Sequence, residues 1–224
     1  MNEPIINDFQ RGLLRGFGQS KLAEKFYWSG GTALAAVYLK HRRSLDLDFF
    51  SGDLFPDDWI LSEINKLKKA SGVSLSQYHK KLNRWLFLFN KGNSTIKFEL
   101  VYYPFLTVGK RKKDKDLKIT VDSLIDIAAN KVQTIFERQE PKDVFDLYWL
   151  LKLKKINLDK LFDLVEKKFG HQIDPITWSA RAVEAAGKTY QLKPMMAKKF
   201  VVDAKILQRF FKEYSFKTLK KKIK

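Results

Sequence analysis

Two aspartates separated by one residue are the part of this sequence with the clearest chemical potential. Asp46 and Asp48 alternate with Leu45, Leu47 and Phe49, and this alternation predicts a β-strand. Side chains two residues apart in a strand point to the same face, so the two carboxylates would lie side by side while the apolar residues face the core. Such a pair repels unless a cation lies nearby, and Mg²⁺ characteristically takes one or two carboxylates together with substrate phosphates. The pattern therefore indicates a divalent-metal site, and a surface strand with exposed aspartates is the structural alternative.

A glycine turn precedes this pair. Gly30 and Gly31 are followed by Thr32, between a predicted strand and a predicted helix. Paired glycines let the backbone approach phosphate closely, because free N–H groups and the positive end of the helix dipole face the anion, and Thr32 adds a hydroxyl donor. Glycines end many strands, and neither GxxxxGK[ST] nor GxGxxG after a strand occurs. The turn gains specificity from the Asp-x-Asp strand that follows it.

These residues require an α/β framework to position them. In the first part, hydrophobic periodicity predicts helices over 19–26, 32–39 and 58–70 and strands over 26–29, 45–50, 73–78, 85–90 and 95–103. In the second part it predicts helices over 121–139, 142–153 and 158–169, one after Pro175 and one from Pro194 to about Tyr214. We therefore predict an α+β protein, with an N-terminal α/β domain containing a mixed sheet (1–108) and a helical, basic domain (109–224). The boundary is placed in the polar segment 109–116.

The charge balance of the chain suggests an anionic partner. The 224 residues include 43 Lys and Arg against 25 Asp and Glu, a net charge of +18, and 28 basic against 15 acidic residues fall in 109–224. With 45% hydrophobic residues a folded core is expected, and the absence of cysteine excludes thiol chemistry and Cys-ligated zinc. No apolar run approaches the roughly 18 residues of a membrane helix. We expect a cytoplasmic protein without a membrane partner, whose basic C-terminal part suits RNA phosphates.

The two motifs together resemble a known family. Tyr27-Trp-Ser-Gly-Gly-Thr-Ala-Leu-Ala35 and His41-Arg-Arg-Ser-Leu-Asp-Leu-Asp-Phe-Phe50 are similar to the motifs of the AbiEii/AbiGii nucleotidyltransferase toxin family, in the polymerase-β-like nucleotidyltransferase superfamily. The resemblance continues in Asp126-Ile-Ala-Ala-Asn-Lys131, in Arg138 and in Lys142-Asp143-Val-Phe-Asp146-Leu. It covers about residues 25–155 and implies a nucleotidyltransferase-like fold for the α/β domain.

The resemblance implies a third acidic strand position beside the glycine turn and the Asp-x-Asp strand. Glu99 has the right alternation and is the only acidic residue between Glu63 and Asp114, although superfamily members often have Asp there. Asp46, Asp48 and Glu99 are therefore the expected catalytic and metal-binding residues. Whether Glu99 binds metal or steers the attacking hydroxyl stays open.

The remaining expected site residues are basic or structural. The expected nucleotide-binding residues are Gly30, Gly31, Thr32, Arg43, Ser44, Lys131 and Arg138, and the expected supporting residues are Asp143 and Asp146. Arg43 and Ser44 could contact phosphate or brace the strand. Asp143 could be a first-turn acid that complements the helix dipole, and Asp146 could hold Lys131 or Arg138 in position. Without the resemblance, a Lys and an Arg two turns apart on a helix are usually solvated surface.

The function implied is metal-dependent nucleotide transfer. We expect Mg²⁺, or Mn²⁺ in its place, as cofactor, an NTP as substrate and RNA such as tRNA as the favoured acceptor. The resemblance further implies the toxin of a toxin–antitoxin or phage-defence pair, with a separately encoded antitoxin as partner. The alternatives are a catalytically inactive nucleotide-binding regulator on the same fold, and a basic RNA-binding module in which the acidic strand is incidental.

Overall fold

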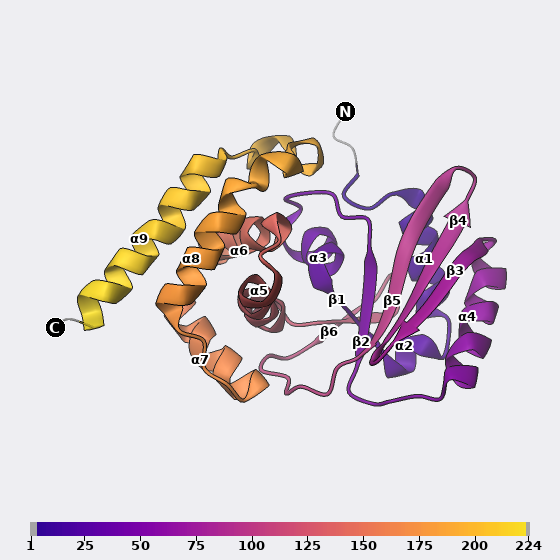
Figure 1. The fold of residues 1–224 in the computed structure, drawn as a ribbon. Helices are drawn as coiled ribbons and strands as arrows, with labels where there is room; N and C mark the ends of the chain where they lie inside the picture. The colour runs from indigo at the N-terminus through magenta and orange to yellow at the C-terminus, as the bar shows by residue number, and fades with distance from the viewer. Residues whose placement is uncertain (1–3, 223–224) are drawn as a thin grey trace. The chain divides into compact units, whose positions relative to one another are not determined.

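The chain divides into two units in the computed structural model, which describes residues 4–222 (Figure 1). The first unit, the sheet unit, runs to Tyr38 and includes Arg43–Phe105 and Lys110–Ser123. The second, the helical unit, contains Leu39–Arg42, Leu106–Gly109 and the chain from Leu124 onward. This differs from the boundary predicted after Val108. The polar segment is followed by the apolar alternation of Ile119–Val121, which adds a strand beside the strand Tyr27–Ser29 and so keeps residues 110–123 with the sheet.

Within residues 4–222, the sheet unit is built on seven strands in the order β3-β4-β5-β2-β1-β7-β6. Their bounds are β1 Tyr27–Ser29, β2 Leu47–Ser51, β3 Ser74–Lys81, β4 Arg84–Lys91, β5 Ser94–Tyr102, β6 Lys112–Asp114 and β7 Ile119–Val121. Two neighbouring pairs, β2 with β5 and β1 with β7, run parallel, and the other neighbours run antiparallel. The predicted mixed sheet is therefore confirmed, with β6 and β7 as strands that the sequence prediction lacked.

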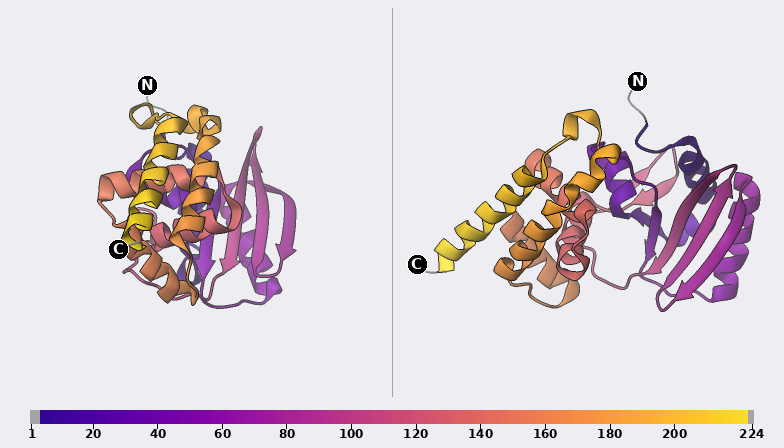
Figure 2. Two further views of the ribbon diagram at one scale, coloured as in Figure 1. Left: turned by 60° about the vertical axis from the view of Figure 1, so that its left-hand side comes forward. Right: turned by 45° about the horizontal axis from the view of Figure 1, so that its top comes forward.

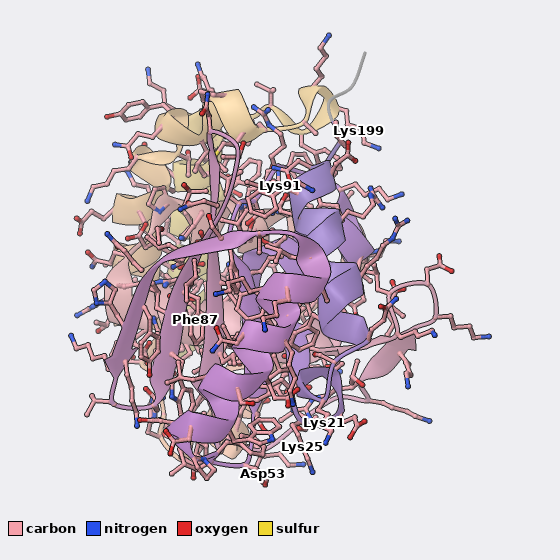
Figure 3. The ribbon with its side chains drawn as sticks, turned by 90° about the vertical axis from the view of Figure 1, so that its right-hand side faces the viewer. Lys21, Lys25, Asp53, Phe87, Lys91 and Lys199 are labelled. Atoms are coloured by element: carbon pink, nitrogen blue, oxygen red, sulfur yellow. The ribbon has the colours of Figure 1, made fainter. Side chains whose placement is uncertain are left out.

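The helices of the sheet unit are α1 Asp8–Gly18, α2 Leu22–Lys25, α3 Gly30–Ala33 with a π-helical continuation Leu34–Leu39, and α4 Asp57–Ser71. Figure 3 shows α4 lying across the sheet with α1 beside it. Helix α1 was not predicted, although Asn7 and Gln10 form a capping box at its start. Its Phe17 ring stacks on Phe49 of β2 with the ring centroids 3.8 Å apart, and Phe98 of β5 packs beside both. This face of the sheet is the core.

The helical unit contains α5 Leu124–Arg138, α6 Pro141–Lys154, α7 Leu158–Phe169, α8 Pro175–Gly187 and α9 Ala204–Lys222, with 3₁₀ turns at Thr189–Met195 and Lys198–Phe200. Helices α8 and α9 lie side by side (Figure 2). Trp178 of α8 is buried, packs against Phe211 of α9 and donates its indole N–H to the carbonyl of Val132, 2.8 Å away. Within residues 4–222 the structure has no helix of the length and apolarity that crossing a membrane requires.

The last helix begins later than predicted. The periodicity favoured a start at Pro194, but Pro194 lies inside a 3₁₀ turn, and the α-helix starts only at Ala204. Asp203 accepts a hydrogen bond from the backbone N–H of Lys205 at 2.8 Å, and such short polar side chains are typical of helix starts.

Candidate active site

Three acidic residues of the sheet unit, Asp46, Asp48 and Glu99, form what we call the acidic cluster. Asp48 of β2 is the register partner of Glu99 of β5, so their side chains share one face of two adjacent parallel strands. Phe49, the next residue along β2, stacks on α1, which places the two carboxylates on the opposite face from that helix. The structure thus brings together the two strand positions predicted from sequence.

Asp46 reaches this cluster from a loop. Strand β2 begins at Leu47, not at Leu45, and Leu45 is 57% exposed rather than part of the core. The loop before the strand is held by side chains instead of by sheet pairing. The Thr32 hydroxyl donates to the carbonyl oxygen of Asp46 and shares a 2.7 Å hydrogen bond with the Ser44 hydroxyl. Gln10 of α1 donates to the Ser44 carbonyl oxygen at 2.7 Å.

These contacts bear on two predicted nucleotide-binding residues. Thr32 is fully buried and Ser44 nearly so, and both hydroxyls are engaged in fixing the loop that carries Asp46. The structure therefore shows both of them in a bracing position. Arg43, between Ser44 and the helical unit's Arg42, is only half-buried.

The glycine turn lies directly against Asp48. Gly30 has φ of +77°, a left-handed conformation that favours glycine, and a Cβ at this position would lie 2.5 Å from Asp48 Oδ2. The preceding residue, Ser29, pairs with Asp48 across β1 and β2 and donates its hydroxyl to Asp122 Oδ2 at 2.7 Å. Asp122 is buried and was not anticipated from sequence. Only a glycine leaves room for the carboxylate at this turn.

Lys97 is a cluster residue that the sequence reasoning missed. Its ammonium nitrogen lies 3.0 Å from Glu99 Oε1 and 3.6 Å from Asp46 Oδ2. Burial alone would lower the pKa of Lys97, but the charges of Asp46 and Glu99 outweigh it and raise that pKa above its ordinary value. The available signal was alternation, since Lys97 is two residues from Glu99 on the same strand and must share its face.

The oxygen donors of this cluster suit a hard divalent cation such as Mg²⁺. Two of them already share a cation, the ammonium of Lys97, which shows that the cluster accommodates positive charge. Across residues 4–222, however, no group of three or more His, Asp or Glu side chains is arranged to hold a metal ion together. Glu99 is turned toward cations instead, with Oε1 near Lys97 and Oε2 3.5 Å from Arg84. A site with two carboxylates fits the habit of Mg²⁺, and the metal-binding role of Glu99 stays a prediction.

The other four predicted residues belong to the helical unit and form an ion-pair network with Arg42. Lys131 of α5 lies 2.6 Å from Asp143 Oδ1 and 2.7 Å from Asp146 Oδ2, both on α6. Arg138 contacts Asp143 at 2.8 Å. These four residues with Arg42 are called the ion-pair network below.

Asp146 is the most heavily engaged member of the ion-pair network. Arg42 donates to both of its oxygens, at 2.6 and 2.8 Å, and His41 Nε2 lies 2.7 Å from Oδ1. Burial by itself would raise the pKa of Asp146, but Arg42 and Lys131 hold it well below its ordinary range. Burial lowers the pKa of His41, against the opposing effect of Asp146. The carboxylate is thus ionised among cations in a dry environment.

Exposure separates the two basic residues predicted to meet the nucleotide. Lys131 is buried, with both neighbouring carboxylates at contact distance, whereas the Arg138 side chain is 48% exposed. Of the two, Arg138 has the solvent access that an anion needs in this conformation. A nucleotide contact by either residue stays a prediction.

Asp126, the first residue of the motif that ends in Lys131, has a structural part in the helical unit. It is fully buried, and its carboxylate accepts hydrogen bonds from the backbone N–H groups of Val108 and Gly109 at 3.0 and 2.8 Å. It also lies 2.6 Å from the ammonium of Lys168 on α7. Asp126 therefore ties the segment 106–109 and α7 to the first turn of α5.

Comparisons with known proteins agree with this arrangement. An uncharacterised protein of Aquifex aeolicus (strain VF5) is 31% identical over 166 residues, which are 71% of this chain and 74% of that protein. Two crystal structures from Helicobacter pylori share the fold. One, of a candidate nucleotidyltransferase, has 19% identity, a TM-score of 0.57 and coverage of 94% of both chains. The other, JHP933, has 18% identity, a TM-score of 0.56 and coverage of 95% of this chain and 93% of that one.

A family model settles the classification. The model of the nucleotidyl transferase AbiEii toxin, of type IV toxin–antitoxin systems, matches residues 12–217, which include the acidic cluster, the glycine turn and the ion-pair network. This range is longer than the residues 25–155 that the motifs themselves cover. The chain belongs to the AbiEii nucleotidyltransferase toxin family.

Proposed function

We propose that this protein is an Mg²⁺-dependent enzyme that transfers a nucleotide from an NTP to an RNA acceptor, tRNA being favoured. The observation that carries the proposal is the contact between the glycine turn and the Asp-x-Asp segment. Because Gly30 has no Cβ, the carboxylate of Asp48 can lie directly against the turn. A phosphate-holding turn beside a metal-type carboxylate is what nucleotide transfer requires.

The residues of the sheet unit have distinct parts in the proposed reaction. Asp46 and Asp48 would hold Mg²⁺, which supplies charge neutralisation for the nucleotide phosphates when bound. Thr32 and Ser44 keep Asp46 in place through the loop contacts described above. Gly30 and Gly31 would offer backbone N–H groups to phosphate. Glu99, held near Lys97, would orient the acceptor hydroxyl or complete the metal site.

The acceptor and the partner follow from charge and family. A net charge of +18 favours a polyanionic acceptor, because each phosphate contacted releases condensed counterions. The type IV toxin–antitoxin family implies an antitoxin partner. We propose that this antitoxin is separately encoded, and that the pair acts in the cytoplasm.

The direct test is incubation with each of four labelled NTPs, Mg²⁺ and total RNA, followed by separation of RNA from protein. We expect label in RNA, and a loss of about 10²–10⁴-fold in the Asp48→Asn variant, because removal of a metal ligand costs several kcal/mol of transition-state stabilisation. The Asp46→Asn variant should behave likewise. Asp53→Asn, an exposed aspartate after β2 (Figure 3), is the matched control and should keep wild-type activity.

Other outcomes would change the conclusion in defined ways. Label in protein rather than RNA would replace the acceptor but keep the enzyme. An absence of label in both, with nucleotide binding retained, would favour a regulator on this fold. RNA binding that needs neither Mg²⁺ nor nucleotide, without any transfer, would favour a basic RNA-binding module.

A further inference from the structure

A lysine lies where a cluster meant for metal would otherwise be purely acidic. Lys97 of β5 has its ammonium 3.0 Å from Glu99 and 3.6 Å from Asp46, and Asp48 contributes to its electrostatic environment. Arg84 approaches Glu99 from the neighbouring strand at 3.5 Å, and its side chain is 51% exposed. Lys97 is thus a cation that bridges the carboxylates of Asp46 and Glu99.

A lysine ammonium and a divalent cation both bind carboxylate oxygens, so they can compete for the same ones. A lysine ammonium is a compact charge on a flexible four-carbon stem, so it can neutralise the cluster and can also swing away. The Lys97 side chain is 36% exposed, so its ammonium can move into solvent. The ammonium of Lys97 in this position reduces the repulsion between the neighbouring carboxylates. It also weakens the electrostatic attraction between these carboxylates and a metal ion.

We propose that Lys97 is the resident counter-ion of the acidic cluster, that it competes with the divalent cation for the carboxylates of this cluster, Asp46 among them, and that it thereby sets the metal concentration at which the protein becomes loaded. This inference rests on the metal site of the proposed function and goes beyond it. A lysine that only supplied phosphate affinity would leave metal affinity in the absence of nucleotide unchanged. A competing lysine lowers that affinity.

The test is calorimetric titration of the full chain with Mn²⁺ in the absence of nucleotide. Lys97→Met removes the charge and keeps an unbranched side chain, and should bind Mn²⁺ about tenfold more tightly than wild type, since a charge a few ångströms away shifts an ionic equilibrium by one or more powers of ten. Lys97→Arg keeps a cation and should stay close to wild type. Lys91→Met, at the exposed end of β4 (Figure 3), changes net charge equally and should have no effect.

A second readout separates competition from a purely structural role. Without divalent cations, the melting temperature of Lys97→Met should lie below that of wild type, because the carboxylates lose their counter-ion. Added Mn²⁺ should raise the melting temperature of Lys97→Met by more than it raises that of wild type. Lower thermal stability with unchanged or weaker Mn²⁺ affinity would overturn the proposal. So would the absence of Mn²⁺ binding in both wild type and Lys97→Met.

The metal site and the role of Lys97 fail separately. If Asp48→Asn binds Mn²⁺ as tightly as wild type, the ion binds elsewhere and the proposed metal site is wrong. If Asp48→Asn weakens Mn²⁺ binding while Lys97→Met matches Lys91→Met, the metal site stands and the competition by Lys97 is refuted.

Discussion

At the scale of single residues, the site depends on side chains that are absent as much as on those that are present. Gly30 combines a left-handed φ with contact to Asp48, so both its conformation and its missing Cβ are needed. Gly92, in the turn between β4 and β5, also has a positive φ, of +55°, but nothing lies within 4 Å of the place where a Cβ would be. The two glycines therefore share a left-handed conformation, but only Gly30 has a side chain, that of Asp48, packed where its Cβ would be.

We expect Gly30→Ala to reduce nucleotide transfer severely and to destabilise the fold by more than Gly92→Ala does. Alanine in a left-handed conformation costs about 1–2 kcal/mol at either position. At Gly30 the new methyl group also displaces the Asp48 carboxylate. Urea unfolding measures the difference in stability, and transfer assays at saturating Mg²⁺ measure the loss of activity. Equal stability losses with full activity in both variants would contradict the contact between Gly30 and Asp48.

At the scale of elements, the ion-pair network joins α5, α6 and the segment 39–42 within the helical unit. Lys131 is its centre, with one carboxylate of α6 on each side, and Arg42 secures the second of them. The sequence suggested that Lys131 meets the nucleotide and that Asp146 supports it. Burial alters what a substitution should do. Removing Asp146 leaves Arg42 and Lys131 with too little negative charge in a dry environment, and removing Lys131 takes away the cation that Asp143 and Asp146 share.

We expect Lys131→Met and Asp146→Asn each to destabilise the protein by about 3–5 kcal/mol, and the double variant to lose clearly less than the sum. The control is the ion pair between Glu184 of α8 and Lys188, the residue that follows this helix. Their charged groups lie 3.1 Å apart, and both side chains are about half exposed. Its coupling should stay below about 1 kcal/mol. The free energies come from urea unfolding of all six single and double variants. Additive losses at Lys131 and Asp146 would show that the two do not act as a unit.

At the scale of the whole molecule, the charge is unevenly distributed along the chain. Residues 109–224 hold 28 basic and 15 acidic residues, a surplus of +13 of the total +18. Several of the acidic residues there are paired internally, among them Asp126 with Lys168 and Asp143 with Lys131, so they do not offset the exposed lysines. A surface of this kind binds polyanions through phosphates without reading sequence.

We expect the affinity for RNA to fall steeply with salt. Each phosphate contact should contribute roughly 0.7 to the slope of log affinity against log salt for a single strand. Binding measured at four salt concentrations gives the slope. The Asp48→Asn variant is the control, because it should keep the slope while losing transfer. A flat response would mean that the charge serves an acidic protein partner instead.

The sequence by itself determined the local features of this protein, because they follow from short-range rules. Glycines between a strand and a helix, alternation around Asp48 and Glu99, and the periodicity of α4, α6 and α7 identify the elements to within a few residues. The family resemblance identified the nucleotidyltransferase class, since it too rests on contiguous motifs.

The tertiary structure decided everything that depends on partners distant in sequence. Nothing local shows that Lys97 faces Asp46 more than fifty residues away, or that Lys131 is enclosed by Asp143 and Asp146. Strand β7 was missed because its three residues become a strand only beside β1. The sequence around a charged residue does not fix the surroundings of its side chain. Only the fold determines whether water, an opposite charge or a buried neighbour surrounds it.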